Sequence, residues 1–371
     1  MNSRERALRI LHYHDYDRLP VVHFGIRPDT LRAWHGQGHL TAAEVEGAVL
    51  GDEEVERITT RLGFDFGWAH CLKPNTGLLP SFERKVLEEL PDGFRKILAS
   101  DGTIILERKG AGSIPAHVDY TLKGRREWEE CYLPRLQYSD ERINWQVLET
   151  LKDDAGREKP IGLHCGSLFG VIRNWLTLEG SAYLLADDEA LFDEIIDTVG
   201  ELCYRCVERV LAAGARFDFA HFWEDICFRS GPLVNPRVFE RKVGPHYKRI
   251  TELAHRYGIE IVSLDCDGKI DALIPIWLQN GVNTMFPIEV GPWEASIAPW
   301  RAQYGRELRG VGGVDKRVFS QDYAAVDTEI ERLRPLVDLG GYIPCPDHRL
   351  PPDAKWENVQ YYCERMRRVF G

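Results

Sequence analysis

Short apolar runs alternate with longer segments of helical character along most of the chain. Each run ends in polar or glycine-containing residues, and the apolar positions of the following segment recur every three or four residues. The runs lie at 19–25, 64–70, 159–166, 217–225, 259–268, 282–290, 308–317 and 341–349. Near-continuous apolar strands are typical of a parallel sheet buried on both faces. Eight strand–helix units predict an α/β protein whose sheet closes into a single (β/α)8 TIM barrel.

The helices predicted between the strands have recognisable ends. The clearest spans 187–214, where acidic residues lead and Ala-Ala-Gly closes the segment. Segments 235–258 and 269–281 follow the same pattern, and each ends in a glycine that suits a helix C-cap. We expect a helix over each of these three segments.

One stretch, 83–140, interrupts the alternation of strand and helix. Within it, 94–110 carries two β-like runs on either side of an Asp-Gly turn, a pattern that predicts a β-hairpin. We therefore predict one barrel domain over residues 1–371, with an N-terminal extension and with 83–140 as an insertion near the barrel mouth.

The amino-acid composition limits which kinds of molecule the protein can bind. The 47 Lys and Arg residues are outnumbered by 58 Asp and Glu residues, giving a net charge of −11, whereas a nucleic-acid-binding protein needs a concentrated basic face. The N-terminus lacks the apolar stretch of a signal peptide, and no apolar segment has the length of a membrane span. The nine cysteines are scattered and odd in number, as expected for reduced thiols. We expect a cytoplasmic protein with no nucleic-acid or membrane partner. Its oligomeric state stays open, a homodimer included.

Polar side chains directly follow the apolar runs. Active sites of (β/α)8 barrels lie at the carboxyl ends of the strands, where a polar side chain must find partners or face a cavity. The candidate catalytic residues are His164, His221, Glu224, Asp265 and Glu289. The candidate substrate-binding residues are His23, Arg27, Trp223, Asp315 and Lys316. We expect an active site at the barrel mouth. The alternative for any single residue is a polar layer that closes the barrel and has no catalytic role.

The fifth strand ends in Asp265-Cys266-Asp267, so both carboxylates point to one face of the strand. Together with His348 from the last strand they predict a site for a divalent metal, zinc or another, with hard oxygen and nitrogen ligands. A second interpretation is a proton-handling pair in which one carboxylate raises the pKa of the other. A third is structural: Asp267 caps the next helix and Asp265 pairs with Lys316 or an arginine.

Five longer stretches resemble one known family. They are 3–21, 166–180, 217–226, 265–283 and 340–353. Through them the chain resembles, over nearly its whole length, the uroporphyrinogen decarboxylase superfamily, which includes uroporphyrinogen decarboxylases and cobalamin-dependent methyltransferases. The resemblance implies a (β/α)8 barrel, in agreement with the strand pattern.

The decarboxylase branch fits less well. Its members carry an Arg-Gln-Ala-Gly-Arg-Tyr-Met-Pro stretch after the first strand, where arginines hold propionate groups, but residues 23–34 offer only Arg27. The aspartate that follows their second strand has no counterpart in 65–71. A protein of net charge −11 is also a poor host for a substrate with eight carboxylates. We therefore do not expect a true uroporphyrinogen decarboxylase.

The zinc methyltransferases of the superfamily carry His-x-Cys-Gly after the fifth strand and a cysteine near the end of the eighth. Asp265, Asp267 and His348 stand in those places, so soft ligands are replaced by hard ones. His348 also matches a histidine of the decarboxylases, where it would contact substrate.

The resemblance implies a methyltransferase-like enzyme that moves a methyl group between a small methylated substrate and a corrinoid. The chain has no corrinoid-binding Asp-x-His-x-x-Gly signature, so the corrinoid would be carried by a partner protein. A metal or a protonated carboxyl would polarise the leaving group. Two alternatives stay open. One is decarboxylation or other acid/base chemistry on a carboxylated substrate, and the other is a non-catalytic barrel that binds a tetrapyrrole or corrinoid.

Overall fold

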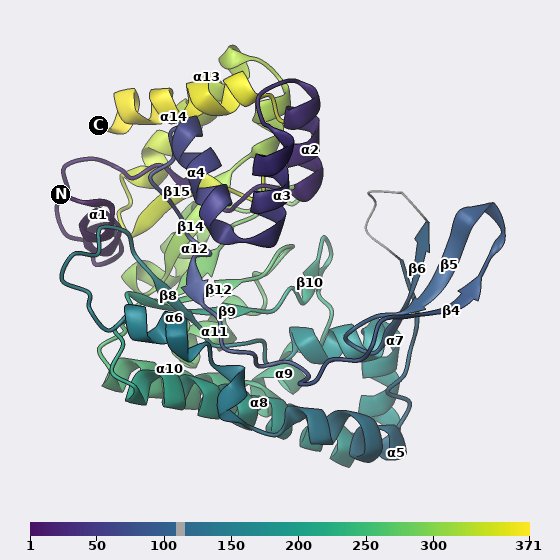
Figure 1. Ribbon diagram of the computed structural model, residues 1–371. Coiled ribbons are helices and arrows are strands. Elements are labelled where there is room, and N and C mark those ends of the chain that lie inside the picture. The colour runs from purple at the N-terminus through teal and green to yellow at the C-terminus, as the bar shows by residue number, and fades with distance from the viewer. Residues whose placement is uncertain (109–115) are drawn as a thin grey trace.

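Seven parallel strands form the central sheet of the computed structural model, which describes residues 1–108 and 116–371 (Figure 1). In sheet order they are β15 (Tyr342–Pro346), β14 (Arg309–Val314), β13 (Thr284–Phe286), β12 (Val262–Asp265), β9 (Phe219–Trp223), β8 (Gly162–His164) and β3 (Cys71–Leu72). β1 (Val22–His23) pairs in parallel with β2 (Phe66–Gly67). Each predicted apolar run contains one strand, and β3 lies just beyond the run 64–70.

The first and last strand segments are joined just beyond their ends. Ile26 and Leu350 form a parallel bridge, and the amide of Leu350 donates to the carbonyl of Gly25 at 3.0 Å. β2 and β3 are two pieces separated by a short break in the same stretch of chain. The fold is an α/β barrel of the (β/α)8 type, as predicted.

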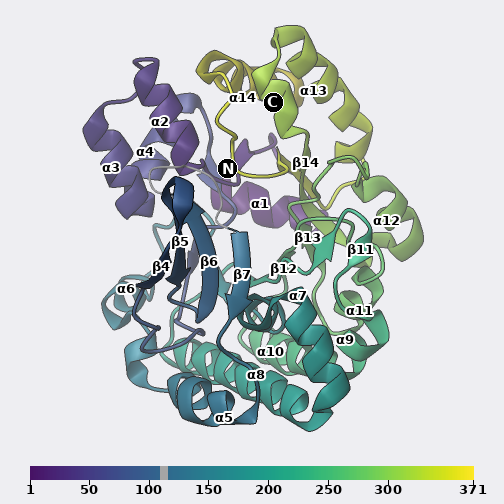
Figure 2. The same cartoon turned by 90° about the vertical axis from the view of Figure 1, so that its right-hand side faces the viewer.

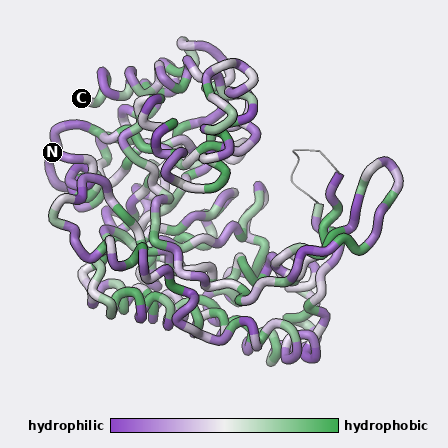
Figure 3. Tube along the Cα trace, in the orientation of Figure 1, coloured by the Kyte–Doolittle hydropathy of each residue, from purple (hydrophilic) through white to green (hydrophobic). Residues whose placement is uncertain are grey.

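Helices surround the strands (Figures 1 and 2). Their bounds are α1 (Ser3–Leu11), α2 (Pro28–Gly36), α3 (Ala42–Leu50), α4 (Asp52–Leu62), α5 (Arg125–Glu127), α6 (Trp145–Thr150), α7 (Gly170–Asp187), α8 (Glu189–Ala212), α9 (Pro236–Lys242), α10 (Gly244–Arg256), α11 (Ile274–Gln279), α12 (Ile297–Tyr304), α13 (Tyr323–Val337) and α14 (Trp356–Phe370). Along α8 the buried residues recur every three or four positions, and Figure 3 shows this helix alternating between apolar and polar residues. Within residues 1–108 and 116–371, no helix combines the length and apolar character needed to cross a membrane.

The predicted helix over 187–214 is α8, and Asp188 caps it by accepting from the amide of Leu191. The segment 235–258 is two helices instead of one. Pro245 lies in the first turn of α10, where its ring and missing N–H prevent a continuous helix through that point.

The predicted helix at 269–281 is shorter than expected. α11 begins only at Ile274, with Pro275 in its first turn, and residues 271–273 form a turn before it. Proline lies in the first turn of both α10 and α11, the two helix starts that the sequence pattern did not locate.

The insertion holds a four-stranded antiparallel sheet, which extends the predicted hairpin. Its strands are β4 (Lys85–Glu89), β5 (Phe94–Leu98), β6 (Thr103–Arg108) and β7 (Ala116–Tyr120), in that order. β5 and β6 form the predicted pair around Asp101-Gly102, and the end of the predicted hairpin falls on residues outside the described ones. The sheet stands to one side of the barrel (Figures 1 and 2). Every residue of β4 is exposed, so it lacks the apolar pattern of the barrel strands.

Two short strands, β10 (Cys227–Phe228) and β11 (Gly231–Pro232), form a small hairpin after β9. This hairpin lies beside the loop that follows β12, because the amide of Lys269 donates to the carbonyl of Phe228. It therefore helps to shape the barrel mouth next to Asp267.

Candidate active site

Parallel pairing brings the strand ends together at one mouth. Asp265 at the end of β12 is in register with Trp223 of β9 and Phe286 of β13. His164 of β8 is in register with His221 of β9. These residues are far apart in the sequence, and the parallel pairing of the barrel strands makes them neighbours.

Four acidic side chains, one lysine and one histidine form what we call the mouth cluster. Its members are Asp265, Asp267, Glu289, Lys316, Asp347 and His348. Lys316 Nζ lies 3.2 Å from Glu289 Oε1 and 3.7 Å from Asp347 Oδ1. His348 Nε2 lies 3.5 Å from Asp267 Oδ2. The lysine therefore compensates two of the carboxylates, and Asp267 is left with the histidine.

Backbone amides complete the bonding of Glu289 and Asp347. Glu289 accepts from the amide of Gly268 at 3.0 Å, and Asp347 accepts from the amides of Val290 at 2.8 Å and Lys316 at 3.1 Å. Oδ1 of Asp267 is buried and has no hydrogen-bond partner among the described residues. Asp267 is the member of the cluster with unused bonding capacity.

The electrostatics of the cluster favour protonated carboxyls. Burial and then the charges of Glu289 and Asp225 raise the pKa of Asp267 to about 8. Burial and the neighbouring Asp267 raise the pKa of Asp265 well above its ordinary value. Burial also raises the pKa of Asp347 to about 6, against the opposing charge of Lys316. Burial lowers the pKa of His348. At neutral pH, Asp267 therefore holds a proton beside an uncharged imidazole.

His164 and His221 lie deeper, with their rings 5.9 Å apart. His164 Nδ1 accepts from the amide of Gly166 at 3.1 Å, and His221 Nδ1 lies 2.6 Å from Ser263 Oγ. Burial, followed by the charge of Lys73, lowers the pKa of His164 to about 4, and burial lowers the pKa of His221 well below its ordinary value. Both imidazoles are neutral at pH 7 and offer hydrogen bonds to the barrel interior.

Glu224 points toward a helix. Its residue is fully buried, and its carboxylate collects donors at the start of α7. They are the amides of Leu168, Phe169 and Gly170, at 2.8, 3.0 and 2.6 Å, the hydroxyl of Ser167 at 3.2 Å, and the hydroxyl of Tyr247. This set of contacts anchors α7 to the end of β9. The sequence pattern alone does not distinguish Glu224 from Asp267 as candidate catalytic residues, because both follow apolar strands.

The remaining predicted residues occupy separate positions. His23 is buried on β1, and its Nε2 lies 3.6 Å from Glu56 Oε1. Arg27 pairs with Asp29 at 2.8 Å, and Asp315 pairs with Arg317 at 2.6 Å. Trp223 is half-buried beside Asp265 on the neighbouring strand. The structure thus brings Lys316, but not Arg27 or Asp315, into the mouth cluster.

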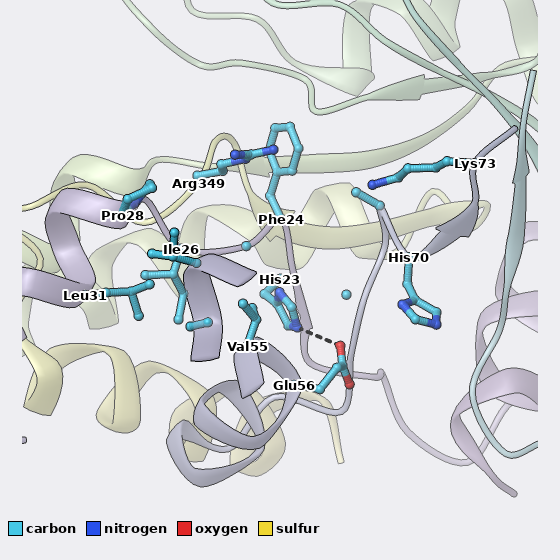
Figure 4. Close-up of a pocket in the computed structure, with 15 residues that line it drawn as sticks. His23, Phe24, Ile26, Pro28, Leu31, Val55, Glu56, His70, Lys73 and Arg349 are labelled. Carbon is cyan, nitrogen blue, oxygen red and sulfur yellow. Dashed lines mark ion pairs between the residues drawn. The ribbon is translucent and has the colours of Figure 1, made fainter. Parts of the chain in front are cut away.

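Two cavities open at the mouth. The first, of about 240 Å³, is lined by His23, Phe24, His70, Lys73, Arg349 and an apolar wall (Figure 4). The second, of about 460 Å³, is lined by Asp267, Glu289, Arg173, Arg229, Phe228 and Trp293, among others. Lys73 and Arg349 carry no role predicted from the sequence. The one available signal was their position directly after strands of the barrel.

A structural metal site needs several His, Cys, Asp or Glu ligands grouped around one point. Among the residues that the structure describes, no three His, Cys, Asp or Glu side chains are grouped so that they could hold a metal ion. Asp267 and His348 are close to each other, but two ligands do not make a metal site. A metal at Asp265, Asp267 and His348 stays a prediction.

Comparison with known proteins gives a family and a fold. The family model described as uroporphyrinogen decarboxylase (URO-D) matches residues 115–369. None of the curated proteins matches the chain. A solved methyltransferase from Methanosarcina mazei superposes with a TM-score of 0.65 at 14% identity, over 100% of this chain and 99% of that one. A Listeria monocytogenes structure described as a vitamin-B12-independent methionine synthase gives a TM-score of 0.42 at 12% identity, over 96% and 97% of the two chains. At such identities the methyltransferase likeness is one of fold.

Proposed function

The chain belongs to the uroporphyrinogen decarboxylase family, and on that premise we propose an enzyme that transfers a methyl group from a small O-methyl or N-methyl substrate to a corrinoid carried by a partner protein. The observation that carries this function is Asp267, whose Oδ1 has no hydrogen-bond partner among the described residues and whose Oδ2 lies 3.5 Å from His348 beside an open cavity. Methyl transfer from oxygen or nitrogen leaves a basic atom that needs a proton. Asp267 is placed to supply it.

The reaction at this site balances as a displacement with general-acid assistance. The methyl–oxygen or methyl–nitrogen bond of the substrate lies beside Asp267 and breaks. The electron pair of that bond stays on the leaving atom, which takes the proton from the Asp267 carboxyl as the methyl carbon bonds to the acceptor. When bound at the mouth, a corrinoid held by the partner would supply the nucleophile that accepts the methyl group.

Neighbouring side chains keep the proton where it is needed. The positive charge of Lys316 lies close to Glu289 and Asp347 and compensates these two carboxylates. After the transfer, His348 is close enough to return a proton to Asp267 from solvent. Burial, followed by the charges of Glu289 and Asp225, disfavours a lasting negative charge on Asp267.

The mouth is accessible to a group held by another protein. The side chains of Asp267 and His348 are 29% and 30% exposed, so the proton donor is sheltered but reachable from outside the barrel. This partial exposure fits a corrinoid that stays on its own carrier. The nine free cysteines support the predicted cytoplasmic location.

The test uses purified protein, free cob(I)alamin as methyl acceptor and a panel of O-methyl and N-methyl compounds. We expect formation of methylcobalamin, followed by absorbance, and a loss of about 10²–10⁴-fold in rate for Asp267→Asn. Asp353→Asn is the matched control, because Asp353 is exposed and lies outside the cluster. A wild type that methylates cob(I)alamin from no compound of the panel, or an Asp267→Asn variant with the full rate, would overturn the proposal.

Decarboxylation is the second candidate, and the same protonated carboxyl favours it. A proton on Asp267 could be delivered to the carbon that loses carbon dioxide. Release of carbon dioxide from carboxylated substrates, with no methyl acceptor present, distinguishes this reaction from methyl transfer.

A further inference from the structure

The first cavity has two chemically different ends (Figure 4). One end is cationic. Lys73, in the loop after β3, and Arg349, after β15, reach toward the same space near Phe24, with His70 at the rim. Both cations are exposed, and neither has an ion pair or a side-chain hydrogen bond within the described part of the chain. Most arginines of this protein do have such partners, as Arg27 does with Asp29.

The other end of the cavity is apolar. It is formed by Ile26, Pro28, Leu31, Ala48, Val49 and Val55, from the segment after β1 and from helices α2 to α4. The cavity of about 240 Å³ lies below the ~300–1,000 Å³ typical of sites for drug-sized ligands, so it suits a small molecule. Its two ends match a ligand with one charged group and one compact apolar group.

The acidic group on the cavity floor is already compensated. Glu56 lies 3.6 Å from His23, the contact drawn as a dashed line in Figure 4, and 2.6 Å from Lys159 Nζ. Its negative charge is therefore shared between two bases. The cationic end of the cavity keeps a net positive character toward an incoming anion.

Phe24 links this cavity to the mouth cluster. Its ring lies 5.6 Å from the ring of His348 and 4.5 Å from that of Phe286, and Phe286 is in register with Asp265. Arg349 directly follows His348 in the chain. A ligand held against Phe24 is therefore a neighbour of the groups that handle the proton.

We propose that this cavity is a substrate subsite for a small monocarboxylate, whose carboxylate lies between Lys73 and Arg349 and whose apolar part packs on Phe24 and the apolar wall. Arginine can bind a carboxylate with two parallel hydrogen bonds, and lysine adds a compact positive charge. This subsite rests on the proposed function, for which it names the substrate class. The small size of the cavity excludes a large polycarboxylate as its occupant.

Direct binding tests the subsite. The probe is 4-methoxybenzoate, with the uncharged 4-methoxybenzamide as its isosteric comparison, measured by titration calorimetry without any methyl acceptor. We expect the carboxylate to bind at least tenfold more tightly than the amide. We also expect Lys73→Met and Arg349→Met each to raise its Kd by about tenfold or more, as for loss of a charge-assisted hydrogen bond.

The controls change cations nearby that have the same exposure. Lys269→Met and Arg32→Met alter exposed residues that line neither cavity, and their Kd should stay within twofold of wild type. Arg349→Lys keeps the charge and should retain most of the affinity, which guards against a folding defect in Arg349→Met. Thermal melts of every variant check that the fold is intact.

Failure here is separable from failure of methyl transfer. Asp267→Asn should still bind 4-methoxybenzoate, so a protein that binds the carboxylate but transfers no methyl group sinks only the proposed function. Absent or saturation-free binding of 4-methoxybenzoate, equal binding of the amide, or an unchanged Kd in both Met variants would overturn the carboxylate subsite.

Discussion

Glu224 is fully buried and Asp267 is half-buried; both follow neighbouring strands of the same barrel, yet their surroundings differ. Glu224 accepts from three backbone amides and two hydroxyls. Asp267 has one contact with a histidine, and its Oδ1 has no hydrogen-bond partner among the described residues. Burial raises the pKa of both groups, but the donors around Glu224 oppose that rise. Burial alone therefore does not mark a reactive carboxyl, and the number of donors separates the anchor from the acid.

The largest expected effect is on the anchor. Glu224→Ala removes the acceptor of the amides at the start of α7 and of the buried Tyr247 hydroxyl. We expect a loss of about 4 kcal/mol in the free energy of unfolding, as for other buried charged groups whose partners are left unpaired. Urea denaturation measures this, with exposed Glu240→Ala as the control. A loss below about 1 kcal/mol would mean that Glu224 does not anchor the helix.

The second effect concerns the close approach that the anchor requires. A Cβ on Gly170 would lie 1.8 Å from the backbone oxygen of Glu224, a contact that neither segment can relieve easily. We expect Gly170→Ala to destabilise the protein by about 2–3 kcal/mol through overpacking. The matched control is Gly36→Ala, also in a helix, where a Cβ meets nothing within 4 Å. This control should be neutral or stabilising by up to about 1 kcal/mol, because alanine favours a helix. Equal melting temperatures for the two variants would argue against a tight junction at Gly170.

The barrel was predictable because its strands are short apolar runs with helix-length spacers, a pattern that local sequence carries. The exact ends of helices and the exposed strands were harder to predict from the sequence. Pro245 divides one predicted helix, and the exposed strand β4 carries no apolar signal. The family model matches 115–369, in agreement with a resemblance read from the motifs.

The candidate site was predictable only as a set of strand-end residues. Whether a side chain at such a position faces the mouth or a helix depends on donors contributed from elsewhere in the chain, such as Tyr247 for Glu224. Lys73 and Arg349 were missed for a related reason. A lysine or arginine indicates an anion-binding site when it has no acidic neighbour in space. The sequence alone does not show which residues are neighbours in space.

The third prediction concerns Glu56, a carboxylate paired with two basic side chains. It has fewer partners than Glu224 and more than Asp267. His23 and Lys159 outweigh the effect of burial and lower the pKa of Glu56 from 4.5 to about 2. A lowered folded-state pKa stabilises the protein above the unfolded value, and this contribution is lost as the pH falls from about 4.5 toward 2. Glu56→Gln should therefore cost about 2 kcal/mol at pH 7, allowing for a side chain that is 24% exposed. Urea midpoints of both proteins from pH 7 to 3 should converge in acid. A pH-independent difference would contradict the ion-pair interpretation.

The smallest expected effect has the opposite sign and concerns the acid itself. Asp267 has a pKa raised from 3.8 to about 8 in the folded state, so the folded protein holds a proton that the unfolded chain releases near pH 4. Stability from this group is complete below about pH 4 and is lost as the pH rises toward 8. Asparagine carries no such proton, so Asp267→Asn should match the wild type near pH 4 and exceed its stability by about 1 kcal/mol at pH 8. This gain is smaller than the pKa change alone implies, because the side chain is 29% exposed and its charge is partly screened. Asp353→Asn, measured in parallel, should show no such pH dependence. If Asp267→Asn were instead less stable than the wild type at every pH, Asp267 would be a structural residue like Glu224, and the contrast between anchor and acid would fail.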